Sequence, residues 1–235
     1  MTGTPRGLSG GGARSDRARA DRSGVLAVLR EHASDDTLAQ MGPRYGIHTQ
    51  EALGVPMAAM KRIARDLGRD HALAAVLWAT AIYEARIVAA LIDEAELITI
   101  EQMDRWCADF DNWALCDTVC FSLFDRAPQA WTRLRPWAHD DRQFVRRAAF
   151  ALLWSLALHD ASAADAQFVE GLALAEQHAA DERPLVTKSM SMSLRAIGRR
   201  NSSLQAAVRA TAGRLVQADS GPARRVGRTA LRDMP

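Results

Sequence analysis

Apolar residues recur at intervals of three and four positions along almost the whole chain between Val25 and Leu231, and this spacing constrains the fold more than any other feature. An α-helix has 3.6 residues per turn, so residues with this spacing share one face that can be buried. Two clear examples are 70–92, with Leu73, Val76, Leu77, Ala81, Val88 and Leu91, and 141–158, with Phe144, Val145, Ala148, Ala149, Leu152, Leu153 and Leu156. No alternating run of β-branched residues long enough for a strand interrupts the pattern. The sequence therefore predicts an all-α fold.

Polar residues and glycines divide the helical pattern into short segments. The breaks fall near Ser34, Gly54, Gly68, Asp93, Asp111, Arg126, Asp140, Asp160, Asp181, Asn201 and Asp219. They predict about twelve helices, with two helices in roughly 35–40 residues, which is the spacing of HEAT-like repeats. About six such pairs would form a curved α-solenoid whose concave face can hold an elongated partner. The sequence shows no strict repeat, and periodicity alone fits an irregular helical bundle equally well.

Charge is distributed unevenly along the 235 residues, although the formal net charge is only +2. Residues 1–22 contain five arginines and two aspartates, whereas residues 23–182 contain 14 basic and 24 acidic residues. Residues 183–235 contain 11 basic residues but only two acidic ones, Asp219 and Asp233. A segment so one-sided is typical either of a surface that faces a polyanion or of a solvated rim. We expect this C-terminal quarter to supply most of a basic concave face.

The first 22 residues differ in composition from the rest of the chain. They are mostly Gly, Ser, Thr, Ala and charged residues, too poor in apolar side chains to be packed, and we expect a disordered Arg/Gly-rich leader. Residues 23–235 are expected to form a single domain, since 48% of the chain is apolar. No secretory signal, membrane-spanning run or metal-binding cysteine pattern is found. We therefore expect a cytoplasmic protein without a metal site, a cofactor or membrane contact.

Few residues outside the helical pattern point to chemistry. No Gly-rich phosphate loop, HExxH motif or G-x-S-x-G turn is present, and the six histidines are scattered. The most unusual stretch is 106–117, in which Trp113 and Asp117 lie four residues apart and would share a helix face. Taken alone, such a pair is most often a core tryptophan beside an exposed aspartate. Arg146 and Arg147 would likewise most often lie at a solvated helix edge.

Several segments together resemble the AlkD-type DNA alkylation-repair proteins, which are bacterial DNA glycosylases built from HEAT-like helical repeats. The resemblance runs from about Met41 to Asn201. Its landmarks, in the expected order, are Met41–Ile47, Leu53–Pro56, Leu77–Trp78, Tyr83–Arg86, Asp109–Asp117, Phe144–Phe150, Asp181–Arg183, Leu194–Arg195 and Ile197–Asn201. The resemblance favours the solenoid over the bundle, with a concave basic face that binds double-stranded DNA.

The resemblance also implies an activity, namely excision of cationic N-alkylated purines such as 3-methyladenine and 7-methylguanine without base flipping. A monofunctional glycosylase of this kind needs a carboxylate that stabilises the oxocarbenium character of the deoxyribose. The matching position is Asp117, and Trp113 would pack against the nucleotide. By the same comparison, Tyr45 would contact DNA near the lesion. Arg147, in preference to the neighbouring Arg146, would hold a backbone phosphate.

One position departs from the family pattern. The family usually has a tryptophan within Lys-x-x-x-Trp-x-Leu-Arg, and here Met192 takes its place between Lys188 and Arg195. We expect all three residues to lie on the DNA-binding face. Methionine is apolar and polarisable, but it offers no flat ring to a cationic base. The lesion range and the excision rate are therefore expected to differ from the family's.

Two further functions remain compatible with the sequence. One is a catalytically weak HEAT-like module that binds damaged or branched DNA, which Met192 favours. The other is a solenoid scaffold for protein partners, against which the retained Tyr45, Trp113, Asp117 and Arg147 argue. The glycosylase is the preferred interpretation, and it implies a monomeric, nucleoid-associated protein.

Overall fold

The computed structural model describes residues 21–232, which form thirteen α-helices and two short 3-10 helices and contain no strand. The helices are α1 Arg22–Glu31, α2 Asp35–Tyr45, α3 Met57–Leu67, α4 His71–Trp78, α5 Tyr83–Ile92, η1 Ala95–Leu97, α6 Ile100–Ala108, α7 Trp113–Ser122, η2 Phe124–Arg126, α8 Ala130–Ala138, α9 Gln143–His159, α10 Asp165–His178, α11 Pro184–Gly198, α12 Ser202–Val216 and α13 Gly221–Arg232. The predicted all-α class is confirmed.

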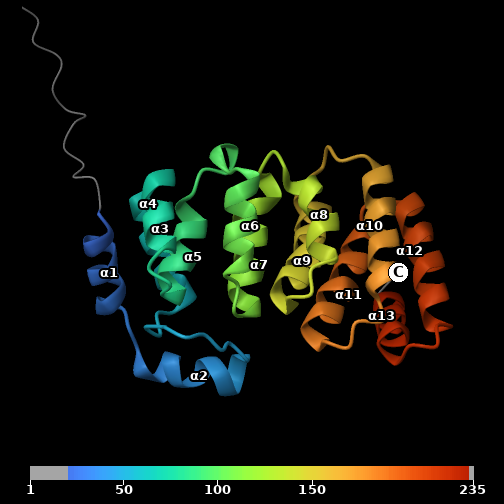
Figure 1. Ribbon diagram of the computed structural model, residues 1–235, viewed down its shortest axis with the longest axis horizontal. Coiled ribbons are helices and arrows are strands. Elements are labelled where there is room, and N and C mark those ends of the chain that lie inside the picture. The colour runs from blue at the N-terminus through green and yellow to red at the C-terminus, as the bar shows by residue number, and fades with distance from the viewer. Residues whose placement is uncertain (1–20, 233–235) are drawn as a thin grey trace, which may run out of the picture.

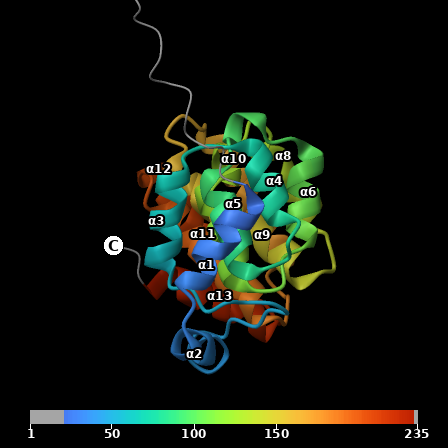
Figure 2. The same cartoon turned by 90° about the vertical axis from the view of Figure 1, so that its left-hand side faces the viewer.

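The helices stack side by side along the long axis, with α1 at one end and α12 and α13 at the other (Figure 1). Neighbours in sequence pack in pairs, such as α4 with α5, α8 with α9 and α12 with α13. Viewed along the stack, α4, α6 and α8 lie on one side and α3 on the other (Figure 2). The exception is α2, which lies crosswise below the upright helices in both views. The arrangement is that of a solenoid of helix pairs.

One continuous core of buried apolar side chains runs through the stack, from Val25 in α1 to Ala230 in α13. The longest helix, α9, has 17 residues and packs against α7, α8 and α11. Because it is covered on most of its faces, α9 forms a rigid support between α7 and α11. Among residues 21–232, no helix is long and apolar enough to cross a membrane.

The apolar pattern of 70–92 predicts one helix, and this is wrong, because the chain breaks after Trp78 and starts again at Tyr83. The turn contains neither glycine nor proline. It is formed by Ala81, which has a left-handed φ of 61°, and by Thr80, whose hydroxyl donates to the Leu77 carbonyl (2.7 Å). The apolar spacing continues across the turn because residues on both sides of it are buried in the same core. Periodicity could not reveal this break.

Helical structure begins slightly before the predicted domain boundary. Arg22 is the first residue of α1, and the Asp21 carboxylate accepts from the Gly24 amide (2.8 Å), a typical N-cap contact. The last residue of the predicted leader, Arg22, therefore belongs to the first helix, and the residue before it, Asp21, caps that helix. The rest of the predicted leader, residues 1–20, lies outside the described residues.

Candidate active site

A cavity of about 450 Å³ lies between α2, the start of α3 and the N-terminal half of α7. Its polar wall includes Tyr45, Trp113 and Asp117. The structure thus brings together three residues that the family resemblance assigns to the site, although Tyr45 is far from the other two in sequence. We call this space the Asp117 cavity.

The first turn of α7 determines where Trp113 and Asp117 lie. Asn112 is 1% exposed, and its side-chain oxygen accepts from the Leu115 amide (2.9 Å), which fixes the start of the helix. Trp113 is then the first helical residue and Asp117 lies about one turn later. The indole nitrogen of Trp113 donates to the Tyr45 carbonyl oxygen (3.0 Å). This bond fixes the ring and ties the end of α2 to α7.

The Asp117 carboxylate is held by Arg147 of α9. Arg147 Nε donates to Oδ1 (2.9 Å) and Nη2 donates to Oδ2 (2.6 Å), while Nη1 donates to the Leu185 carbonyl oxygen (2.5 Å). The Arg147 side chain is only 3% exposed, and the Asp117 side chain is 18% exposed. A two-pronged pair of this kind restricts the orientation of both groups. Asp117 therefore lines the cavity, and Arg147 lies behind it.

Burial and the charge of the partner shift the pKa values of Asp117 and Arg147 in opposite directions. Burial raises the pKa of the Asp117 carboxyl above its ordinary value, while the charges of Arg147 and Lys188 act to lower it. Burial also acts to lower the pKa of Arg147, but the charge of Asp117 and the hydrogen bonds to it, together with smaller contributions from Cys116 and Cys120, outweigh burial and raise that pKa. Little water separates these groups, so their interaction is stronger than it would be at the surface.

The neighbouring Arg146 points to a different set of partners. Its Nη1 donates to Asp181 Oδ2 (2.8 Å) and its Nε donates to the Asp140 carbonyl oxygen (3.0 Å). Burial acts to raise the pKa of Asp181, but hydrogen bonds from Arg183 and Arg146 outweigh it and hold the pKa well below its ordinary value. Arg146 thus links α9 to the segment before α11, and it does not line the Asp117 cavity.

The three candidate residues of α11 also lie outside the cavity lining. Lys188 is exposed, and it is close enough to Asp117 for its charge to act on that carboxyl. Met192 is half-buried, and its sulfur lies 3.7 Å from Nη1 of Arg195. Their roles in DNA binding remain predictions.

Sequence reasoning missed the apolar wall of the cavity. It is formed by Met41 of α2 together with Met57 and Met60 of α3. The methionine that the sequence analysis assigned to the site, Met192, belongs to another helix. Methionine is flexible and polarisable, so this wall can adapt to a flat ring without being aromatic. The spacing of three between Met57 and Met60 indicated a shared helix face, but not which cavity that face borders.

A buried carboxylate positions the loop that enters α3, and it too was not predicted. Glu84 is 0% exposed, and its oxygens accept from the backbone amides of Leu53 (2.9 Å), Gly54 (2.8 Å) and Val55 (3.2 Å). Gly54 has a φ of +75°, and a Cβ there would lie 2.4 Å from the Ser34 carbonyl oxygen. Two of the family landmarks, 53–56 and 83–86, therefore meet in space beside the Asp117 cavity.

Comparison with known proteins defines the class of the molecule first. The fold matches a solved structure described as "a new family of proteins related to the HEAT-like repeat DNA glycosylases with affinity for branched DNA structures", with a TM-score of 0.73 and 18% identity over 91% of this chain and 95% of that chain. This likeness confirms the HEAT-like solenoid architecture. No curated protein matches the sequence significantly. The sequence model of the DNA alkylation repair enzyme family matches residues 25–232, and the chain belongs to this family.

Proposed function

We propose that the protein binds double-stranded DNA and excises cationic N-alkylated purines, such as 3-methyladenine and 7-methylguanine, without flipping the base into a pocket. The observation that carries the proposal is that Asp117 and Trp113 line one cavity, with the 47% exposed Tyr45 on the same wall. Membership of the DNA alkylation repair enzyme family supports the same role.

The chemistry requires only a well-placed negative charge. An alkylated purine cation leaves as a neutral heterocycle, so the leaving group needs no general acid. Positive charge develops on the deoxyribose as the glycosidic bond breaks, and a fixed carboxylate stabilises it. Asp117 supplies that carboxylate and can orient the attacking water, while Trp113 packs against the nucleotide.

The Asp117–Arg147 pair limits how Arg147 can contact DNA. Both carboxylate oxygens and the Leu185 carbonyl already accept from Arg147. A contact between Arg147 and a backbone phosphate would therefore require one guanidinium nitrogen to leave its present partner. In our proposal Arg147 mainly orients the carboxylate, and the exposed Lys188 is better placed to meet a phosphate directly.

A catalytically weak module that binds branched or damaged DNA is the second candidate. Two observations favour it, namely Met192 in place of the family's tryptophan and the bidentate ion pair that offsets the charge of Asp117. The structural relative with affinity for branched DNA supports the same alternative.

One experiment separates the two candidates. Purified protein is incubated with N-methylated duplex DNA, released bases are measured by chromatography, and affinity for four-way junctions is measured alongside. The glycosylase predicts release of 3-methyladenine or 7-methylguanine well above the spontaneous rate, and a further increase in Met192→Trp. Tight junction binding without release, in both the wild type and Met192→Trp, would instead establish the binding module.

A further inference from the structure

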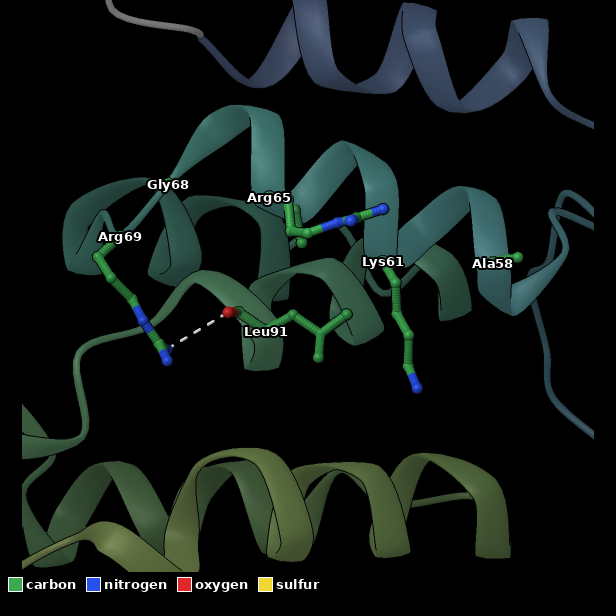
Figure 3. A pocket seen from close by; sticks show the side chains of 7 residues that line it. Ala58, Lys61, Arg65, Gly68, Arg69 and Leu91 are labelled. Atoms are coloured by element: carbon green, nitrogen blue, oxygen red, sulfur yellow. Dashed lines mark hydrogen bonds between the residues drawn. The ribbon is translucent and has the colours of Figure 1, made fainter.

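A second cavity, of about 600 Å³, lies beside α3 and is bordered by basic side chains. Lys61, Arg65 and Arg69 surround it, and Ala58, Ala64 and Leu91 form its apolar floor. Figure 3 shows Lys61 extending from α3 into this space and Arg69 reaching the Leu91 carbonyl oxygen (3.3 Å). None of the three cations was singled out from the sequence.

Two of these cations differ from the arginines of the Asp117 cavity region. Lys61 and Arg65 are exposed, and within residues 21–232 neither has a carboxylate or a carbonyl as a hydrogen-bonding or ion-pair partner. Arg146 and Arg147, by contrast, are each bound to an aspartate. Arg69 also donates to the Asp93 carbonyl oxygen (2.5 Å), which anchors it at the edge of the cavity. Lys61 and Arg65 can therefore accept an anion without first breaking an ion pair.

The position of α3 connects this basic cavity to the candidate active site. Met57 lines the Asp117 cavity, and Lys61 and Arg65 follow it at intervals of four residues on the same stripe of the helix. Each interval corresponds to a rise of about 6 Å, so the stripe extends roughly 12 Å from Met57. A strand that leaves the Asp117 cavity along α3 would meet both cations in succession.

We propose that Lys61 and Arg65 bind the backbone phosphates of the DNA strand that flanks the nucleotide at the Asp117 cavity. The inference rests on the proposed function, because it takes DNA to be the ligand of that cavity. The small side chains of Ala58 and Ala64 leave room for the sugar–phosphate backbone, and long basic side chains suit phosphates without reading sequence. The site contributes affinity and register for the strand, not base specificity.

The test is the salt dependence of duplex binding by the full chain. In the double variant Lys61→Gln with Arg65→Gln, the slope of log affinity against log salt should fall by roughly 2, since each phosphate contact contributes about 0.9. Affinity at low salt should fall by roughly tenfold. The matched control, Arg62→Gln with Arg105→Gln, removes two exposed cations that do not line the cavity. The slope of this control should change by less than half of the change seen in the Lys61/Arg65 double variant. Lys61→Arg with Arg65→Lys keeps both charges and should retain the wild-type slope.

Neutral methylphosphonate linkages identify the contacted phosphates. Placed one by one beside the lesion, they should weaken wild-type binding at particular positions, and the Lys61/Arg65 double variant should be insensitive at those same positions. If the wild type binds with a steep slope but the double variant behaves like the control, the inference is overturned and the proposed function stands. If the wild type binds no duplex, the proposed function fails.

Discussion

The Asp117–Arg147 pair gives the candidate site its geometry at the level of single residues. A carboxylate that stabilises a cationic sugar has to be ionised and correctly aimed. Arg147 orients the Asp117 carboxylate through two hydrogen bonds. Its positive charge, however, also offsets the negative charge that the proposed reaction needs. Burial strengthens both the hydrogen bonds and the charge compensation, because little water lies between Arg147 and Asp117. In the proposed reaction, the rate of base release would therefore depend on how much of the Asp117 charge Arg147 still offsets once DNA is bound.

Removing Arg147 should destabilise the fold strongly. Arg147→Met leaves Asp117 buried without its partner, and loss of one member of a buried pair typically costs about 3–5 kcal/mol. Arg142→Gln removes an arginine just before the same helix whose own side chain is 60% exposed in its pair with Asp140, and it should cost less than about 1 kcal/mol. Urea unfolding of both variants measures the difference, and equal losses would contradict the structural role of the buried pair.

The same pair predicts a shift in the pH dependence of base release. In the proposed reaction only ionised Asp117 can stabilise the cationic sugar, so release should fall as the pH drops through the pKa of Asp117. Burial raises that pKa and Arg147 acts to lower it, so Arg147→Met should raise the pKa further and move the acid limb to higher pH. Single-turnover release across a pH series tests this. An acid limb that stays in place, or moves to lower pH, would count against Asp117 as the titrating group.

Among the structural elements, the entry to α3 shows how the fold supports the cavity. The Glu84 carboxylate replaces missing backbone partners of the loop 53–55, and this loop leads directly to Met57 and Met60. Gly54 is required there by both its left-handed φ and its closeness to the Ser34 carbonyl. The loop is thus held by buried contacts that any side chain at residue 54 would disrupt.

Two glycine substitutions distinguish the need for glycine at residue 54 from the ordinary effect of glycine on helix propensity. Gly54→Ala should destabilise the protein by at least about 2 kcal/mol, because strained backbone and overpacking add together. Gly213→Ala lies within α12, where an added Cβ meets nothing within 4 Å, and it should stabilise the protein by roughly 0.5–1 kcal/mol. Thermal unfolding compares the two, and a neutral Gly54→Ala would show that the loop is not held as tightly as described.

The elements also show what could be predicted from the sequence and what could not. Helical periodicity placed most helices, because burial against neighbours imposes the spacing of three and four. The break at Ala81 escaped it, because a left-handed alanine leaves no composition signal. The shared wall of Trp113 and Asp117 followed from a spacing of four on one helix. The bond between Asp117 and Arg147 joins two residues that lie 30 positions apart in the sequence, and only the packing of α7 on α9 determines it.

For the whole molecule, the position of the cavity within the stack determines how DNA could lie on it. The Asp117 cavity lies among α2, α3 and α7, toward the N-terminal end, whereas α11, α12 and α13, which carry the described part of the basic C-terminal quarter, lie toward the other end (Figure 1). Lys61 and Arg65 place further positive charge on the N-terminal side of the cavity. A duplex that crosses the site would then be held on both sides, as a concave basic face requires. That the C-terminal quarter supplies such a face remains a prediction.

The most direct test of the central claim compares base release by wild type and Asp117→Asn in single turnover on methylated duplex DNA. Asparagine keeps the size of the side chain and an acceptor for Arg147 but removes the charge, and release should fall by about 10²–10³-fold. Duplex binding should persist or tighten slightly, because a negative charge near the phosphates is gone. Asp36→Asn, an exposed position on α2, serves as the control and should leave release unchanged. Unchanged release by a folded Asp117→Asn variant would contradict the account and leave a DNA-binding solenoid without this catalytic carboxylate.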